Sequence, residues 1–127
     1  MKIAIVEDDE IQSRSLAKEL GDNGFTVLQA FDGAEGLKLV ERERPDLILL
    51  DILMPKMDGM EFLKRLRESS GGNDIPVIFL TVVKPDDDII RKVAAYHPAF
   101  YLMKPDWRLE DIAAKVKEVL KIDGERT

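Results

Sequence analysis

The sequence predicts an α/β fold, in which helices cover both faces of an open parallel sheet. Short apolar runs alternate with segments of helical periodicity, and glycine, proline or polar stretches separate them. Several of the runs are apolar throughout, which is typical of parallel strands buried on both faces. Because strands alternate with helices, the connections should be right-handed crossovers. The 127 residues fit a single domain.

Five apolar runs are predicted to be strands. The third is the clearest, because four aliphatic residues lead directly into Asp51. The predicted strands are residues 2–6, 26–30, 47–51, 77–81 and 100–103. The carboxyl ends of parallel strands lie at one edge of the sheet, and ligands of such folds bind at that edge.

Three segments between the strands present one apolar face at the spacing of an α-helix. These faces are Ser13, Leu16, Ala17 and Leu20; Gly59, Phe62, Leu63 and Leu66; and Leu109, Ile112, Ala113, Val116 and Leu120. Weaker helices are predicted over residues 34–42 and 87–95. Asp9 and Asp58 precede the first and third helices, where a carboxylate can cap backbone N–H groups. For Asp9, contact with a metal is the less favoured alternative.

Composition excludes several classes of function. The net charge is −6 and no stretch is rich in lysine or arginine, so this domain is not expected to bind nucleic acid. The absence of cysteine excludes disulfides and thiol chemistry and fits a reducing compartment. No apolar run approaches the ~20 residues that span a bilayer, and the N-terminal run meets acids rather than continuing as a signal peptide. We therefore expect a soluble, cytoplasmic protein without membrane partners.

Four of the predicted strand ends carry polar side chains. Glu7 and Asp8 follow the first strand, Asp51 ends the third, Thr81 ends the fourth and Lys104 follows the fifth. Carboxylates within ~4–6 Å of one another disfavour their own ionisation, so such a cluster takes up protons or a cation. Because the nearby ligands are oxygen atoms, Mg²⁺ is the expected ion and Mn²⁺ the alternative. Asp8 and Asp51 are predicted to be direct ligands, and Glu7 a ligand through water.

The same side chains suit phosphoryl transfer. A carboxylate such as Asp51 can act as a nucleophile toward a phosphoryl group and form an aspartyl phosphate. A metal ion, the Lys104 amine and the Thr81 hydroxyl can then neutralise and hydrogen-bond the phosphoryl oxygens. Taken alone, Thr81 would be an ordinary strand-end residue and Lys104 an ordinary surface lysine. Only their expected position beside Asp51 favours a phosphoryl-transfer site.

Three motifs identify a family that the chain resembles. They are Ile5-Val6-Glu7-Asp8-Asp9; Asp51 followed by Met54-Pro55 and Met57-Asp58-Gly59; and Lys104-Pro105. Together they resemble the receiver domain of two-component response regulators, over residues 2 to about 120. The resemblance implies a flavodoxin-like fold of five βα units, a doubly wound parallel five-stranded sheet with strand order 2-1-3-4-5 and helices on both faces.

The resemblance also implies roles for individual residues. Asp51 would accept a phosphoryl group from a histidine kinase or phosphotransfer protein, and the main-chain carbonyl of Leu53 would complete the metal shell. Thr81 and Tyr101 would be coupled switch residues that bias two existing packings of the fourth helix, fifth strand and fifth helix. A cis peptide bond would precede Pro105. Such a domain catalyses only its own phosphorylation and dephosphorylation, and it signals to an effector protein or an output domain.

Several residues near the site depart from the family's pattern. Val82 follows Thr81, where the family usually has a very small residue, so we expect narrower access for phosphate. Leu53 and Val83 occupy positions that tune the attack of water on the aspartyl phosphate. Since both side chains are apolar, they predict slow autodephosphorylation.

The region around the fifth strand departs from the pattern as well. The acids that usually precede the switch aromatic in dimerising receivers are missing, so a monomer or weak dimer is expected. Phe100, Tyr101 and Trp107 form either an apolar docking patch or half-buried packing, two interpretations of similar weight. His97 is the only histidine and is interpreted as structural.

Other functions are weighed against the leading one. The main alternative is a divergent receiver that acts through protein contacts without phosphorylation. A phosphohydrolase with Asp51 as nucleophile would need a second aspartate where the chain has Leu53. A flavin-binding protein would need a phosphate-binding loop where acids follow the first strand. The receiver domain is predicted to span residues 1–122, and residues 123–127 to be a tail or the start of a linker.

Overall fold

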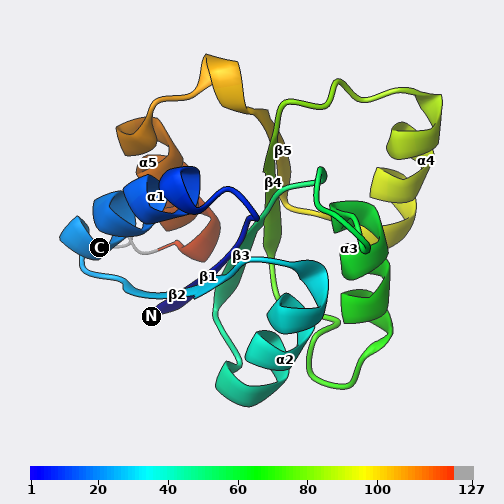
Figure 1. Cartoon of the computed structure of the whole chain (residues 1–127), viewed down its shortest axis with the longest axis horizontal. Helices are drawn as coiled ribbons and strands as arrows, with labels where there is room; N and C mark the ends of the chain where they lie inside the picture. The colour runs from blue at the N-terminus through cyan, green and yellow to red at the C-terminus, as the bar shows by residue number, and fades with distance from the viewer. Residues whose placement is uncertain (122–127) are drawn as a thin grey trace.

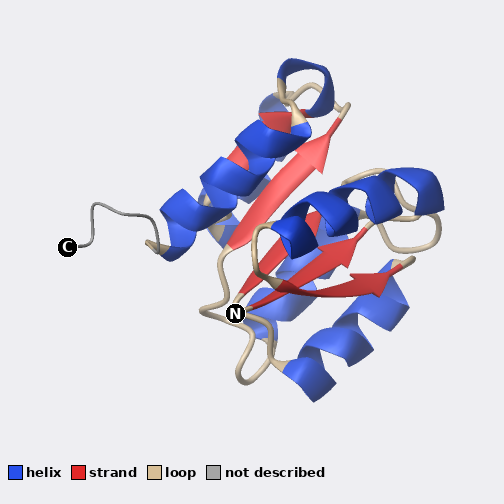
Figure 2. Cartoon of the chain, turned by 90° about the vertical axis from the view of Figure 1, so that its left-hand side faces the viewer, coloured by secondary structure: helices blue, strands red, loops and turns tan. Residues whose placement is uncertain are grey.

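Five parallel strands alternate with five α-helices in the computed structural model, which describes residues 1–121 (Figure 1). The sheet has the order β2-β1-β3-β4-β5, and its parallel strands are seen in Figure 2. The predicted flavodoxin-like fold and strand order are therefore confirmed. The elements are β1 (Lys2–Val6), α1 (Glu10–Asp22), β2 (Thr26–Ala30), α2 (Gly33–Glu43), β3 (Leu47–Leu50), α3 (Gly59–Glu68), β4 (Val77–Thr81), α4 (Asp87–Tyr96), β5 (Phe100–Met103), the short 3₁₀ helix η1 (Lys104–Asp106) and α5 (Leu109–Leu120).

The core consists of two apolar clusters, one on each face of the sheet. Helices α1 and α5 cover one face, and α2, α3 and α4 cover the other (Figure 1). In β1, Ile3 and Ile5 belong to the first cluster, whereas Ala4 and Val6 belong to the second. Because both faces of the strand are covered, its side chains can be apolar without interruption, which explains the pattern seen in the sequence.

The helix starts follow the predicted capping pattern. The Asp9 carboxylate accepts hydrogen bonds from the N–H groups of Ile11 and Gln12, and Asp58 accepts one from Glu61. Both caps satisfy N–H groups that have no partner inside their helix.

The longest helix, α1, has 13 residues. Within the part of the chain that the structure describes, no helix has both the length and the apolar character to cross a membrane.

The register of the sheet sets the positions of the polar strand ends. Val6 pairs with Leu50, so the residues that follow them, Glu7 and Asp51, emerge side by side. Thr81 pairs with Met103, which places Lys104 just beyond Thr81 at the same edge. A slip of one residue along β3 would draw Asp46 or Asp51, which flank its apolar run, toward the buried part of the sheet, so the ends of the apolar runs favour this alignment.

Gly36 in α2 provides a test of the packing against the sheet. A Cβ atom there would lie 2.9 Å from Phe62 Cε2 and 3.0 Å from Val6 Cγ1, and both side chains are fully buried. Gly36→Ala should therefore lower the free energy of unfolding by about 1–3 kcal/mol through overpacking. Gly21→Ala in α1 is the control, because a Cβ there would meet nothing within 4 Å; it should be neutral or stabilising by up to roughly 1 kcal/mol. Urea unfolding measures both, and a Gly36→Ala protein as stable as Gly21→Ala would contradict the prediction.

Candidate functional site

Three carboxylates meet at the carboxyl edge of the sheet, next to β1 and β3. One oxygen atom from each of Glu7, Asp8 and Asp51 lies within 4.8 Å of the others. Glu7 and Asp51 are buried, whereas Asp8 is exposed. The structure thus brings together the three acids that the sequence places at adjacent strand ends.

Lys104 supplies the positive charge of this cluster. Its Nζ lies 2.7 Å from Oε1 of Glu7 and 3.0 Å from Oδ2 of Asp51. Burial lowers the pKa of Lys104, but the hydrogen bonds to the two carboxylates more than offset it, so the pKa lies above its usual value. The amine is therefore charged at neutral pH and holds the two acids together.

Glu7 is the carboxyl group of the site whose pKa is most clearly shifted. Its pKa is raised to about 7, mainly by burial and also by the charge of Asp51, although hydrogen bonds from Lys104 and from the N–H of Asp9 oppose the rise. One ammonium group is thus insufficient to keep this carboxyl fully ionised near neutrality. Added positive charge at the site would stabilise the ionised form.

The loop after β3 shapes the surroundings of Asp51. Oδ1 of Asp51 accepts a hydrogen bond from the N–H of Leu53 at 3.2 Å. The N–H of Gly59, the first residue of α3, donates to the carbonyl of Ile52 at 2.9 Å. A Cβ on Gly59 would lie 2.8 Å from Cα of Ile52, so only glycine permits this close approach. The sequence places Gly59 both in the motif that follows Asp51 and on the apolar face of a helix, but it does not indicate this close approach to Ile52.

The tip of the same loop contains a tight turn. Lys56 has a φ of 69°, and the N–H of Met57 donates to the carbonyl of Pro55 at 2.7 Å. Left-handed backbone is uncommon outside glycine. Nothing in the residue type of Lys56 predicted this conformation.

Thr81 and Tyr101 both contact Val83, in the loop between β4 and α4. The fully buried Thr81 hydroxyl accepts a hydrogen bond from the N–H of Val83 at 3.3 Å, and the Tyr101 hydroxyl donates to the Val83 carbonyl. Burial, then the charges of Asp51 and Asp86, raises the pKa of Tyr101. Within residues 1–121, no hydrogen bond joins Thr81 to Asp51 or Lys104.

Two apolar side chains at this edge are exposed. Leu53 is 55% exposed and Val82 is 53% exposed. Val83, by contrast, is partly buried and packs against the core. Of the three residues near the site that depart from the family's pattern, Leu53 and Val82 are thus exposed and Val83 is packed.

The expected cis peptide bond before Pro105 is wrong, since no cis bond occurs in the described residues. Lys104, Pro105 and Asp106 instead form a 3₁₀ turn, in which the N–H of Trp107 donates to the carbonyl of Lys104 at 3.3 Å. Proline suits the first positions of such a turn, because its fixed φ is helical and its missing N–H is not needed there.

The aromatic residues near β5 do not form one patch. Phe100 and Trp107 pack against the cluster under α1 and α5, whereas Tyr101 packs against the other. Lys115 Nζ lies 4.4 Å from the ring centroid of Phe100 and 5.6 Å from that of Trp107. This arrangement favours the packing interpretation over the docking patch. His97 caps the end of α4 with a φ of 54°, in agreement with a structural role.

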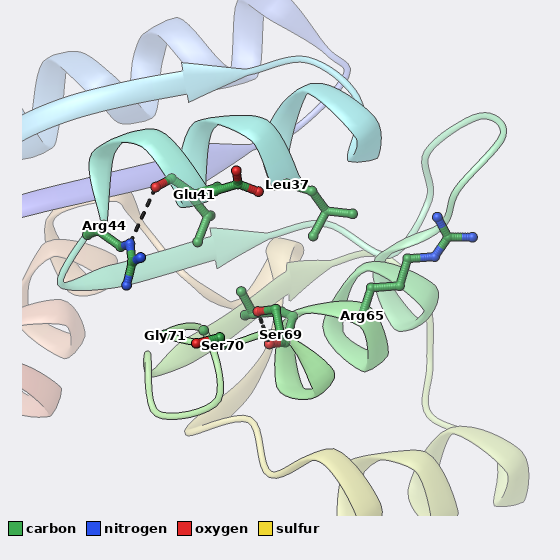
Figure 3. Close-up of a pocket in the computed structure, with 10 residues that line it drawn as sticks. Leu37, Glu41, Arg44, Arg65, Ser69, Ser70 and Gly71 are labelled. Atoms are coloured by element: carbon green, nitrogen blue, oxygen red, sulfur yellow. Dashed lines mark hydrogen bonds between the residues drawn. The ribbon is translucent and has the colours of Figure 1, made fainter.

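A hollow of about 210 Å³ lies between the ends of α2 and α3, away from this site (Figure 3). Its lining includes Arg44, whose Nε donates to the carbonyl of Glu41 at 3.3 Å, and Ser69, whose hydroxyl donates to that of Leu66 at 2.7 Å. None of the predicted site residues lines it. The candidate site is therefore the cluster of acids and Lys104 at the carboxyl edge of the sheet.

The fold and the acidic cluster define a class of protein: a flavodoxin-like α/β domain with three carboxylates and a lysine at the carboxyl edge of its sheet. The model of the response regulator receiver domain family matches residues 3–117. The chain therefore belongs to the receiver domain family of two-component response regulators, as the motifs predicted.

Individual relatives agree with this family. The chain is 38% identical over 123 residues to the response regulator MprA of Mycobacterium leprae, covering 95% of this chain and 51% of that protein. It thus spans about half the length of the curated relatives it matches. Among solved structures, the chemotaxis protein CheY4 of Vibrio cholerae matches with a TM-score of 0.84 and 29% identity, over 93% of this chain and 97% of that one. A CheY-like receiver domain protein from Methanospirillum hungatei matches with a TM-score of 0.86 and 29% identity, over 94% and 93%.

Lys104→Met should destabilise the domain, because it leaves Glu7 and Asp51 without their shared partner. The expected loss is about 1–3 kcal/mol of unfolding free energy, limited by proton uptake at Glu7. Lys18→Met is the control, since Lys18 forms an exposed ion pair with Asp22 at 2.9 Å; it should change the stability little. Urea unfolding at neutral pH without divalent cations compares them. Equal losses in the two variants would show that the Lys104 contacts do not hold the site together.

Proposed function

We propose that this domain accepts a phosphoryl group on Asp51 from a histidine kinase or phosphotransfer protein, in a Mg²⁺-dependent reaction. The observation that carries the proposal is the meeting of three carboxylates and the Lys104 amine at one sheet edge, in a chain of the receiver family. Phosphorylation would then switch the surface formed by α4, β5 and α5.

The residues present fit a divalent cation. Asp8 and Asp51 would bind it directly together with the main-chain carbonyl of Leu53, and oxygen ligands suit Mg²⁺ or Mn²⁺. Glu7, whose two oxygens accept hydrogen bonds from Lys104 and from the N–H of Asp9, would contact the ion through water. When bound, the cation would neutralise negative charge on the carboxylates and on the phosphoryl oxygens.

Asp51 would act as the nucleophile. A bond forms between one of its carboxylate oxygens and phosphorus while the bond from phosphorus to the donor breaks, which leaves an aspartyl phosphate. No general base is required, because the carboxylate attacks in its ionised form. Lys104, already 3.0 Å from Asp51, would stabilise a phosphoryl oxygen.

The switch would operate through Val83. The Thr81 hydroxyl accepts a hydrogen bond from the N–H of Val83 while its own O–H is free to donate, so a movement of the hydroxyl toward a phosphoryl oxygen would alter a contact of the loop that leads into α4. The Tyr101 hydroxyl bond to the Val83 carbonyl is the second contact of that loop. A change at Thr81 would therefore alter the packing of Tyr101 by biasing existing conformations.

The wider biological role follows the family. The domain would catalyse only its own phosphorylation and dephosphorylation, act in the cytoplasm as a monomer or weak dimer, and signal to an effector protein or an output domain. It would contact neither nucleic acid nor membrane. We assign residues 1–122 to the receiver domain; the proposed tail, residues 123–127, lies outside the described residues.

Incubation with Mg²⁺ and a small phosphodonor should add the mass of one phosphate to the wild-type protein. Asp51→Asn should abolish the increase, whereas Asp58→Asn in the same loop should retain it, since asparagine can still cap α3. Intact-protein mass spectrometry after labelling, with and without a chelator, measures this. Labelling of Asp51→Asn at the wild-type level would refute the assignment. A wild-type protein that responds neither to the donor nor to beryllium fluoride would favour a receiver that signals without phosphorylation.

The aspartyl phosphate should hydrolyse slowly, because apolar side chains at Leu53 and Val83 cannot orient an attacking water. Leu53→Asn should accelerate the loss of label by roughly tenfold or more, and Leu53→Met should leave it slow. Leu53 is 55% exposed, so neither change disturbs the core. The phosphorylated fraction is followed by mass spectrometry after removal of the donor. A half-life of seconds in the wild-type domain would contradict this prediction.

A further inference from the structure

Arg67 joins the last turn of α3 to the end of α4. Its guanidinium donates hydrogen bonds to the main-chain carbonyls of Ile75 at 2.7 Å and Gly72 at 3.3 Å, in the segment before β4. It also donates to the carbonyls of Tyr96 at 2.8 Å and His97 at 3.1 Å. Tyr96 is the last residue of α4, and His97 is its cap. One side chain of α3 thus holds the carboxyl end of α4.

The Arg67 guanidinium is placed where a positive charge is needed. The last carbonyls of a helix lack partners within the helix and form the negative end of its dipole. Helix α4 has no basic residue in its own last turn. Within residues 1–121, Arg67 forms no ion pair with a carboxylate, so its contacts are the four carbonyls. Arg65, on the same helix, instead forms an exposed ion pair with Glu61 at 2.8 Å.

Helix α4 has few other attachments. Of its ten residues only Ile89 is buried, while Val93 and Tyr96 are partly buried. Helix α3, also ten residues long, buries Gly59, Met60, Phe62, Leu63 and Leu66. Helices with few buried contacts open at lower free energy than the rest of a domain. The hydrogen bonds from Arg67 are therefore a large share of the tertiary interactions that hold α4 against the domain.

The other end of α4 is connected to the candidate site. The loop that leads into the helix contains Val83, whose N–H and carbonyl are bonded to Thr81 and Tyr101. These bonds involve the two proposed switch residues. The two ends of α4 are thus held by different groups, only one of which belongs to the site.

We propose that Arg67 is the positioning residue of α4: it anchors the carboxyl end of the helix on α3, so that rearrangement at the site displaces mainly the end that follows Val83. The displacement rests on the proposed phosphorylation of Asp51. The anchoring does not, because it follows from the contacts of Arg67 alone.

Amide hydrogen exchange tests the anchoring. Arg67→Met should raise exchange at residues 93–97 by about tenfold or more relative to residues 62–66 of α3. Arg67→Lys, which keeps the charge but fewer donors, should raise it less. Arg65→Met is the matched control and should leave the ratio unchanged. The anchoring is overturned if Arg67→Met raises exchange equally in both segments, or if Arg65→Met has the same local effect.

Amide chemical shifts on addition of Mg²⁺ and beryllium fluoride test the displacement. In the wild-type domain the changes should be large at residues 83–87 and small at 95–97. In Arg67→Met they should extend to 95–97, while the rate of phosphodonor labelling stays that of the wild type. Large wild-type changes at 95–97, or an unchanged pattern in Arg67→Met, would overturn the proposal. A wild-type domain with neither labelling nor shifts would refute the proposed function and the displacement together, while the exchange comparison would still decide the anchoring.

Discussion

The bridge that the Lys104 amine forms between Glu7 and Asp51 is the interaction on which the site depends. Lys104 follows the edge strand β5, yet its Nζ reaches acids that follow β1 and β3, past the end of β4. When Glu7, Asp8 and Asp51 are all ionised, three carboxylates and one ammonium leave two negative charges. A single divalent cation balances that charge, which is the electrostatic reason that this cluster suits a cation and then an anionic phosphoryl group.

Much of this arrangement could be predicted from the sequence, because buried parallel strands leave little freedom. Once the apolar runs that end at Val6 and Leu50 are aligned in a doubly covered sheet, Glu7 and Asp51 must emerge side by side. The same constraint brings Lys104 beyond Thr81. What the strand pattern could not give is the orientation of the Thr81 hydroxyl, which is bonded to the N–H of Val83 rather than to the acids.

The features that sequence reasoning missed depend on long side chains and on the backbone of loops. The four carbonyls bound by Arg67 belong to residues from 5 to 30 positions further along the chain, and no periodicity encodes such contacts. The left-handed Lys56 and the trans bond before Pro105 are local conformations that tertiary packing selects. Phe100 and Trp107 both pack against Lys115, whose Nζ lies over the two rings, and the sequence pattern does not indicate this contact.

The two ends of α4 differ in the strength of what holds them. A hydrogen bond between neutral groups, such as that from Tyr101 to the Val83 carbonyl, contributes about 0.5–1.5 kcal/mol, whereas one to a charged group contributes about 1.5–3. Arg67 makes two bonds of the second kind to the carboxyl end of the helix. A disturbance that reaches both ends therefore breaks the contacts near Val83 first. Since those contacts adjoin Thr81 and the acidic cluster, the weaker attachment of α4 lies where a chemical event at Asp51 can act on it.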